Sequence, residues 1–488
     1  MMMYLFGPAL ALLARIVMAF AFAFLVPLAW AWFEDPAPLR AIWGMCFGLT
    51  FGSGWLLALL TRSYRRELLP RDGFLLVNLV WVVLTAFAAV PLLFTVPDIS
   101  WSQAYFEAMS GLTATGATAL SGLDRLPVSA NVWRCFLQLI GGLGIMLLVV
   151  AVLPLLGLGG MQLYKAETPG PMKDAKFTPR IAETARGLWG VYFLFAALCL
   201  LAYRWAGMSW ADAFMHMCTT MGLGGFSSHD ASMGYFDSPA VEMVAIVFMT
   251  LAGISFLRYF VVLRSLTLRP ITHDREIRTY FTVLVASIAL VALMLAAHQT
   301  YASFPDALRS SAFHVLSLAT TTGYSATDYS QWPVFIPVYL MFLGCFVSCA
   351  GSTGGGIKMV RMVLLIKQSR REMVRIIHPR VVNPVTMGGQ TIHASVMTAV
   401  LGFMLIYGAA TMGLTFIMLL TGLDIVTAFS AVVATVNNIG PGLGDVGPAG
   451  NFGSLNGFQL WVLSFAMLLG RLELLSVLVL FTGHFWRR

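Results

Sequence analysis

Ten long apolar stretches decide which folds are open to this chain. They cover residues 8–32, 40–60, 73–95, 131–157, 185–206, 239–263, 279–299, 334–377, 394–420 and 457–482. Each is long enough to cross the hydrocarbon core of a membrane as a helix, which takes about 20 residues. Only 11% of the residues are charged and 59% are hydrophobic, whereas soluble proteins have about 25% charged residues. We therefore expect an all-α polytopic membrane protein, and neither a soluble enzyme nor a disordered chain.

The eighth stretch contains an interruption. It is apolar up to Cys349, reads AGSTGGG over residues 350–356, and becomes apolar again after Lys358. Closely spaced glycines break a helix, and irregular backbone inside a membrane is tolerated only where protein buries it or where it lines a cavity. The sequence therefore predicts an intramembrane loop at 350–356. This loop either lines a cavity or is a static kink buried by its neighbours.

Basic and acidic residues lie in different sets of loops between the apolar stretches. Lysines and arginines gather after every second stretch, in 62–71, 165–186, 264–278, 358–380 and 487–488. Because basic residues mark the cytoplasmic loops of membrane proteins, both termini are predicted to be cytoplasmic. The net charge of +8 is explained by this bias, without nucleic acid as a partner. Most acidic residues fall in the opposite loops, where they either concentrate cations at an entrance or serve only to keep the loops solvated.

Four short segments that end in glycine recur between the apolar stretches. They read WSQAYFEAMSGLTATGAT, WADAFMHMCTTMGLGGFS, FPDALRSSAFHVLSLATTTGYS and LDIVTAFSAVVATVNNIGPG. Recurrence at one topological place indicates internal repeats. We predict two N-terminal transmembrane helices, in residues 1–68, followed by four helix–pore-loop–helix units around one central pore. The units are expected at 69–160, 161–270, 271–380 and 381–488.

The loop of each unit has the composition of an ion filter. Backbone carbonyls and hydroxyls can replace the water around a monovalent cation, and glycine permits the left-handed or closely packed backbone that such a loop needs. A half-helix that points its carboxyl end toward the pore favours a cation. The loops are expected near 113–118, 222–227, 320–325 and 437–442. The candidate ion-binding residues are Ala114, Thr115, Gly116, Gly224, Gly225, Thr321, Thr322, Gly323, Asn438, Ile439 and Gly440.

At these loops the sequence resembles the TrkH/KtrB superfamily of potassium transporters. The matching segments are SGLTATGAT, GLGGFSSHDASMGYFDSP, ATTTGYSATD and VNNIGPGLG. Residues 157–189, the segment CAGSTGGGIKMVRM and the segment LLGRLELLSVLVL make the chain similar to the TrkH branch in particular. The resemblance covers nearly the whole chain, including the two leading spans.

The resemblance implies a homodimer in a bacterial inner membrane that takes up K+ through a filter with one glycine in every repeat. K+ would be the transported ion, with no organic cofactor on this chain. A cytosolic TrkA-type nucleotide-binding subunit would regulate transport. The basic stretch 358–380 would either dock that regulator or be attracted to the lipid of the inner leaflet.

A charge inside the membrane accompanies the glycine loop. Arg471 lies in the last apolar stretch, and a charge there is costly unless it is paired or faces water. The resemblance places it at the pore below the filter, whereas a salt bridge with Glu473 or snorkelling to the interface would make it structural. Lys358 is either a gate residue or a cytoplasmic anchor. The resemblance implies that the loop 350–356 obstructs the pore below the filter. The predicted gate comprises Gly351, Gly354, Gly355, Gly356, Lys358 and Arg471.

Two transport mechanisms remain open. A channel-like K+ uptake subunit and a symporter that couples K+ to H+ or Na+ would use the same filter. An enzyme is not indicated, because the sequence contains no HExxH, GxSxG or Walker A motif.

Overall fold

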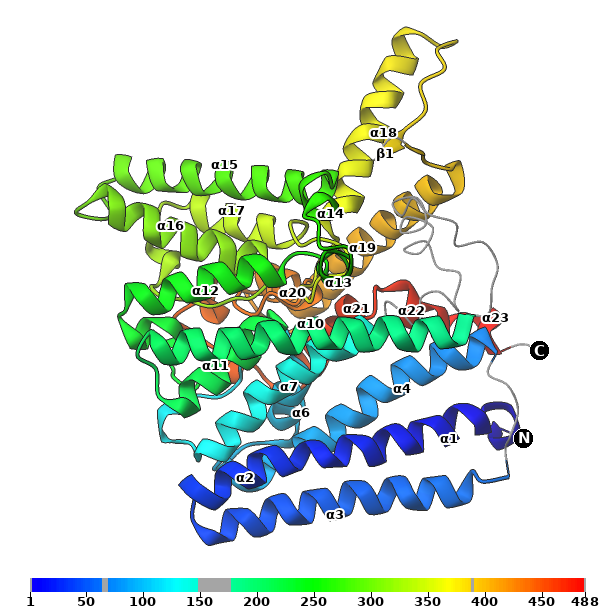
Figure 1. Cartoon of the computed structure of the whole chain (residues 1–488), viewed down its shortest axis with the longest axis vertical. Helices are drawn as coiled ribbons and strands as arrows, with labels where there is room; N and C mark the ends of the chain where they lie inside the picture. Colours follow the sequence, from blue (N-terminus) through cyan, green and yellow to red (C-terminus); the bar gives the residue numbers. More distant parts are fainter. Residues whose placement is uncertain (1, 64–68, 148–176, 388–389, 487–488) are drawn as a thin grey trace.

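The computed structural model describes residues 2–63, 69–147, 177–387 and 390–486, which form an almost entirely helical protein. Most of the long helices lie side by side (Figure 1). Among the described residues, six helices are long and apolar enough to cross a membrane, or up to eight if each of two bent helix pairs is one span. The predicted all-α, multi-pass fold class is confirmed. The predicted basic loop at 165–186 and the end of the stretch 131–157 lie partly outside the described residues.

The two leading spans form a hairpin at one edge of the molecule (Figure 1). The first consists of α1 (Met2–Ala21) and α2 (Leu25–Glu34), and the second is α3 (Ala37–Leu60). The helix α1 packs on both α3 and α4 (Pro70–Ala89). Trp43 of α3 donates its indole N–H to the Ser129 hydroxyl at 2.9 Å. The hairpin is thereby fixed to the rest of the protein.

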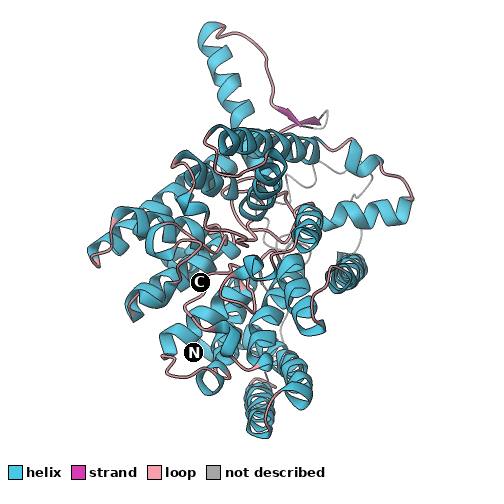
Figure 2. Cartoon of the chain, turned by 90° about the vertical axis from the view of Figure 1, so that its left-hand side faces the viewer, coloured by secondary structure: helices cyan, strands magenta, loops and turns pink. Residues whose placement is uncertain are grey.

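The rest of the described chain repeats one unit four times: a long helix, a short pore helix, a loop and a second helix. The units are α4, α6 (Trp101–Leu112) and α7 (Val128–Leu147); α10 (Phe177–Trp205), α11 (Trp210–Gly222) and α12 (Pro239–Ala252); α15 (Arg275–Ala297), α16 (Phe304–Ala319) and α17 (Phe335–Gly344); and α19 (Ala394–Leu420), α20 (Ile425–Val436) and α21 (Gly457–Arg471). The helix α7 packs on α11, α12 packs on α16, and α21 packs on α6. The fourth unit therefore closes on the first, and loops gather among the surrounding helices (Figure 2).

The pore helices are too short to cross a membrane. They contain 12 to 16 residues, which at 1.5 Å per residue reach about 18–24 Å, less than the roughly 30 Å of a hydrocarbon core. Each begins with a side chain that caps a backbone N–H of the first turn, from Ser100, Ser209, Ser303 and Asp424. Such caps satisfy amides that have no partner within the helix. Each pore helix starts with an exposed residue at the protein surface and ends inside the protein.

Within the described residues, the second helix is broken in the second, third and fourth units, whereas the sequence indicates a break only at 350–356. The helix α12 meets α13 (Phe256–Ser265) at 83°, and α21 meets the segment from Leu475 to Phe481, which begins with α22 (Leu475–Leu478), at 111°. The stretches 239–263 and 457–482 are thus not continuous helices. At the second break, Glu473 and Leu474 have left-handed backbone, with φ of 58° and 41°. Glutamate and leucine are both common within helices, so the sequence does not indicate a helix break at these residues.

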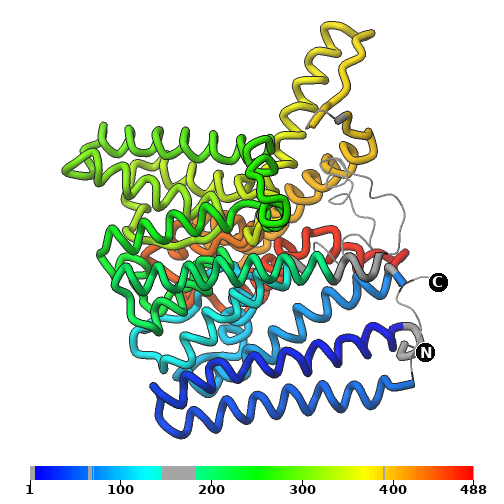
Figure 3. The backbone as a smooth tube through the Cα atoms, viewed as in Figure 1, coloured from blue at the N-terminus to red at the C-terminus, as the bar shows by residue number. Residues whose placement is uncertain are grey.

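In the third unit, α17 and α18 (Met359–Ile377) are separated by the predicted loop, and α18 projects away from the body (Figure 1). After α18 come the two strands β1 (Thr386–Met387) and β2 (Gln390–Thr391), which pair in antiparallel fashion. The connections also include α5 (Leu92–Thr95) and α14 (Arg269–Thr272). The start of α1 and the last helix, α23 (Gly483–Trp486), lie at the same end of the molecule (Figure 3), where the rings of Phe6 and Trp486 are 5.7 Å apart.

Candidate functional site

Each pore helix ends in the same backbone turn. Four amides donate to the carbonyl five residues earlier, namely Thr115 to Ser110 at 2.8 Å, Gly224 to Thr219 at 2.9 Å, Thr322 to Ser317 at 2.8 Å, and Ile439 to Ala434 at 2.8 Å. The residue before each donor has left-handed backbone, with φ of 50° at Ala114, 52° at Leu223, 64° at Thr321 and 53° at Asn438. This is the Schellman ending of a helix, which pairs carbonyls of the last turn. Four different sequences thus adopt one geometry.

The glycine that follows each turn lies against the next loop. Its φ is 85° at Gly116, 72° at Gly225, 83° at Gly323 and 101° at Gly440. A Cβ added at these glycines would lie 1.9 Å from the Gly224 oxygen, 1.9 Å from the Thr322 oxygen, 2.0 Å from the Ile439 oxygen and 2.8 Å from the Thr115 oxygen, respectively. Each glycine therefore touches the carbonyl that precedes the glycine of the next loop, and the fourth loop returns to the first. The four loops form a closed ring in which a side chain has no room.

The eleven candidate ion-binding residues all lie in these four turns. Sequence reasoning missed one residue of the ring, Leu223, which occupies the place of Ala114, Thr321 and Asn438. Leucine is an apolar residue that seldom adopts left-handed backbone. Alignment of the four segments on their glycines identifies Leu223, because it stands two residues before Gly225, as the other three residues stand before their glycines.

Hydrogen bonds between buried polar side chains stabilise the first, third and fourth loops. The hydroxyls of Thr113 and Thr115 are 2.7 Å apart, and those of Thr320 and Thr322 are also 2.7 Å apart. Asn438 donates its amide to the Thr115 hydroxyl at 2.9 Å, which ties the fourth loop to the first. Since these groups are buried, the bonds fix loop backbone that would otherwise be free to move.

A buried ion pair joins the first loop to the second. Arg134 of α7 and Glu107 of α6 are at most 1% exposed, and their Nη2 and Oε1 atoms are 2.7 Å apart. Glu107 also accepts a hydrogen bond from the Thr118 hydroxyl at 3.0 Å. Arg134 donates to the Ser227 carbonyl at 3.2 Å. The pair therefore braces the backbone just beyond Gly116 and Gly225.

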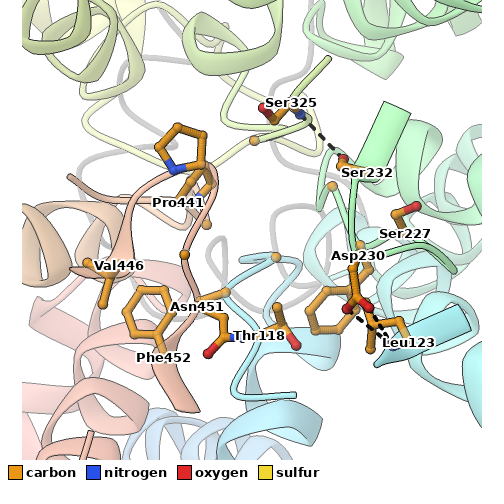
Figure 4. Close-up of a pocket in the computed structure, with 18 of the residues that line it drawn as sticks. Thr118, Leu123, Ser227, Asp230, Ser232, Ser325, Pro441, Val446, Asn451 and Phe452 are labelled. Carbon is orange, nitrogen blue, oxygen red and sulfur yellow. Dashed lines mark hydrogen bonds between the residues drawn. The ribbon is translucent and has the colours of Figure 1, made fainter. Parts of the chain in front are cut away.

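A cavity of about 80 Å³ adjoins the ring, and one glycine of each loop lines it, together with Ala117 and other residues. Thr118, Ser325 and Asn451 bring polar groups to it from different segments (Figure 4). Asp230 also lines it and accepts a hydrogen bond from the Leu123 amide at 3.1 Å. The cavity therefore offers oxygen atoms and a carboxylate to a cation that approaches the ring.

Another titratable group beside this cavity is His229. Its Nδ1 is 2.5 Å from Asp124 and its Nε2 is 3.2 Å from Asp212. The ring stacks on Tyr235 with centroids 3.5 Å apart. Burial acts to lower the pKa of His229, but hydrogen bonds to Asp212 and Asp124 outweigh it, so that the pKa lies above its ordinary value. The imidazole thus connects Asp124 and Asp212 beside the cavity.

The loop 350–356 lies against the ends of three pore helices. The amide of Gly355 donates to the Thr321 hydroxyl at 2.8 Å, and the Thr353 hydroxyl donates to the Met221 carbonyl at 3.0 Å. A Cβ at Gly355 would lie 2.2 Å from the Asn437 oxygen. These contacts involve the second, third and fourth units, so the loop lies directly beside the ring.

The ends of this loop are anchored by backbone contacts. Gly351 and Gly356 have left-handed backbone, with φ of 77° and 78°. The Gly351 carbonyl accepts a hydrogen bond from Phe256 at 3.2 Å. At Gly356 an added Cβ would lie 2.6 Å from the Cys345 oxygen, and at Gly354 it would lie 2.8 Å from the Thr320 oxygen. Glycine is thus needed at each of the four glycine positions of the predicted loop.

Two cations hold the carbonyls of the loop. Arg471 is 3% exposed and donates to the Thr353 carbonyl at 2.9 Å and to the Gly141 carbonyl at 3.0 Å. Lys358 donates its ammonium group to the Gly354 carbonyl. All six predicted gate residues therefore belong to one contiguous group.

The structure does not contain the salt bridge between Arg471 and Glu473 that the sequence left open. Glu473 accepts a hydrogen bond from Arg361 at 2.6 Å instead. Because Arg471 is buried, it does not snorkel to a membrane surface either. Its Nε has no hydrogen-bond partner within the described part of the chain. Its charge is therefore compensated by carbonyl oxygens.

Comparison with known proteins places these features in one family. The family model for TrkH, described as a cation transport protein, matches residues 46–488. The Trk system potassium uptake protein TrkH of Vibrio parahaemolyticus is 45% identical over 87% of this chain and 88% of its own length. The TrkH of Halomonas elongata is 45% identical over 91% and 92%, and the Trk system potassium uptake protein TrkG of Escherichia coli is 38% identical over 91% and 90%.

A solved structure matches as well. The crystal structure of the potassium transporter TrkH from Vibrio parahaemolyticus superposes with a TM-score of 0.91 at 39% sequence identity. The match covers 99% of this chain and all of that chain. The fold is therefore shared over the full length, including the two leading spans.

Proposed function

Because the chain belongs to the TrkH family of cation transport proteins, we propose that it is the channel-like, K+-translocating subunit of a bacterial uptake system. The closed ring of four glycine loops carries this proposal. A cation that leaves water needs several oxygens at once, and the ring presents the carbonyls of Thr115, Gly224, Thr322 and Ile439 in cyclic order. Four pore helices also direct their carboxyl ends, which are partially negative, toward the ring.

The loop 350–356 is the proposed gate of this pathway. It contacts three pore helices, and Arg471 and Lys358 bind its carbonyls. A positive charge beside the ring opposes the passage of K+ while the loop is in place. Movement of the loop away from the ring would break all of these hydrogen bonds. Opening of the pathway therefore requires several hydrogen bonds to break in one step.

The surroundings of the subunit follow from the same proposal. The chain is a multi-pass membrane protein, and we place it in the bacterial inner membrane with both termini in the cytoplasm, since its ends lie at the same side of the helices and basic residues mark alternate loops. The relatives are named as parts of a Trk system. By that likeness we propose a homodimer that binds a TrkA-type nucleotide-binding regulator in the cytosol, with α18 as a docking surface and with membrane lipid around it.

The test is K+ uptake by the full chain in a bacterium that lacks its own K+ uptake. Gly323→Ser would place a Cβ 2.0 Å from the Ile439 oxygen. Gly422→Ser is the matched control, because Gly422 also has left-handed backbone, with φ of 93°, but no atom within 4 Å of an added Cβ. We expect the control to grow on low K+ and the Gly323 variant to lose growth or K+ selectivity. Equal growth and equal selectivity of the two variants at equal protein levels would contradict the proposal.

Coupling to H+ or Na+ is the alternative mechanism for the same ring. In liposomes that contain the purified protein, a channel-like subunit moves K+ down its gradient without a pH or Na+ gradient. A symporter would require one of these gradients or generate one as K+ enters. Measurement of internal pH and Na+ during K+ uptake distinguishes the two.

A further inference from the structure

The second loop of the ring lacks the polar side chains that brace the others. The first and third loops carry Thr115 and Thr322 before their glycines, and each hydroxyl is 2.7 Å from a second threonine. The corresponding residue of the second loop is Gly224, which has no side chain. The hydrogen bonds that fix this loop must therefore come from another element.

Gln138 of α7 supplies these hydrogen bonds. Its side chain is fully buried, and it donates its amide N–H to the Gly224 carbonyl at 2.9 Å. Its carbonyl Oε1 accepts the backbone N–H of Phe226 at 3.1 Å. The amide of Gln138 thus pairs with the loop on both sides of Gly225, as a neighbouring strand would pair with it.

The packing makes Gln138 and Gly224 depend on each other. A Cβ added at Gly224 would lie 2.4 Å from Cδ of Gln138, which is closer than two carbon atoms approach in proteins. Glycine at 224 is therefore required because the amide of Gln138 lies flat against it. The same Gly224 oxygen is the atom on which Gly116 of the first loop packs.

We propose that Gln138 is a positioning residue that sets K+ selectivity by holding the Gly224 carbonyl in the ring. This inference rests on the proposed function of the ring as a filter. The hydrogen bond fixes the position of the oxygen and draws electron density from it. Na+ is smaller than K+ and needs oxygens that move inward or exert a stronger field. The release of this carbonyl therefore favours Na+.

The first test compares the uptake of radioactive Rb+ and Na+ by cells that lack their own K+ uptake. Gln138→Leu removes both hydrogen bonds, and Gln138→Glu in its ionised form keeps an acceptor for Phe226 but does not donate to Gly224. Since a hydrogen bond shifts an equilibrium by about two- to tenfold, we expect both variants to raise Na+ uptake relative to Rb+ uptake at least about twofold.

Gln459→Leu is the matched control. Gln459 is another buried glutamine with two hydrogen bonds, to the Thr421 hydroxyl and from the Asn456 amide, both at 2.8 Å. It lies in α21, and its bonds involve no residue of the ring. Its uptake ratio is expected to match that of the unaltered protein. Protein in the membrane is measured by immunoblot, and the ratio of two ions is independent of its amount.

The second test is a rescue. Gly224→Ala alone would place its methyl group against Gln138 and is expected to reduce Rb+ uptake strongly. Gln138→Ala removes the obstructing amide, so the double variant should transport more Rb+ than Gly224→Ala alone, although with a raised share of Na+. A double variant no better than Gly224→Ala would contradict the contact on which the inference depends.

The outcomes separate the inference from the proposed function. If Gly323→Ser changes the ratio of Na+ to Rb+ and both Gln138 variants leave it unchanged, Gln138 is only a packing residue and the inference is wrong. The same holds if the Gln138 variants transport less of both ions in an unchanged ratio. If neither Gly323→Ser nor the Gln138 variants change the ratio, the ring is not the filter and the proposed function is wrong.

Discussion

Neutralisation of Arg471 should open the pathway. Its guanidinium group joins the Thr353 carbonyl of the loop to the Gly141 carbonyl of α7, at 2.9 and 3.0 Å. A hydrogen bond to a charged group contributes about 1.5–3 kcal/mol. Since each 1.4 kcal/mol is a factor of about ten in an equilibrium constant, Arg471→Gln should shift the loop toward its open position by roughly ten- to a hundredfold. It also removes the positive charge that opposes K+.

The replacement Arg471→Lys separates the effect of the hydrogen bonds from the effect of the positive charge. Lysine keeps the charge, but its ammonium group lacks the planar fork that reaches two carbonyls at once. We therefore expect a smaller increase in flux for lysine than for glutamine. If lysine behaves like arginine while glutamine raises the flux, the charge acts alone and the hydrogen bonds do not hold the loop.

The assay is Rb+ uptake into liposomes that contain the purified full chain and no other protein. Arg264→Gln is the control, because Arg264 is an exposed arginine at the end of α13 and its loss should leave the flux unchanged. Equal amounts of reconstituted protein are verified on gels. If Arg471→Gln and the unaltered protein show the same flux, the loop is not a gate held by Arg471.

Three further predictions concern other parts of the molecule. Arg134→Met should destabilise the protein by about 3–5 kcal/mol, because it leaves the buried Glu107 charge without its cationic partner, and the double change with Glu107→Gln should be milder in thermal unfolding in detergent. His229 has a raised pKa when folded, so its stabilising contribution is complete below about pH 6.5 and is lost as pH rises through the raised value. Glutamine does not titrate, so we expect the unfolding temperature of His229→Gln to decrease less than that of the unaltered protein as pH rises above about 6.5. The corresponding difference in unfolding free energy is under about 1 kcal/mol. Replacement of Arg370 and Arg375, both exposed on α18, by glutamine should weaken copurification with a TrkA-type regulator, and unchanged copurification would exclude these residues from docking.

Repetition made much of the ring predictable. Gly116, Gly225, Gly323 and Gly440 recur at one place in the topology, and the short segments before them have the length of half-helices. The structure gives all four the same left-handed backbone and the same contact with the next loop. Local sequence suffices here because each turn is made within one helix end, by bonds that reach back only five residues.

The parts that sequence reasoning missed depend on contacts between distant segments. Gln138 belongs to the first unit but holds the loop at Gly224, and a buried glutamine in an apolar helix gives no sign of its partner. Arg471 was found as a charge inside the membrane, whereas its ligand, the Thr353 carbonyl, is a backbone atom in another unit. The bend at Glu473 likewise arises from left-handed backbone, which neither apolar periodicity nor glycine content reveals.

The proposed function requires that the four carbonyls of the ring bind the transported cation. It is tested most directly by locating Rb+ in crystals of the protein through anomalous scattering, with Na+ replaced by Rb+ in the solution. We expect a peak on the axis of the ring, among the oxygens of Thr115, Gly224, Thr322 and Ile439. Well-ordered loops with no Rb+ at the ring, or Rb+ bound only elsewhere in the membrane region, would contradict it.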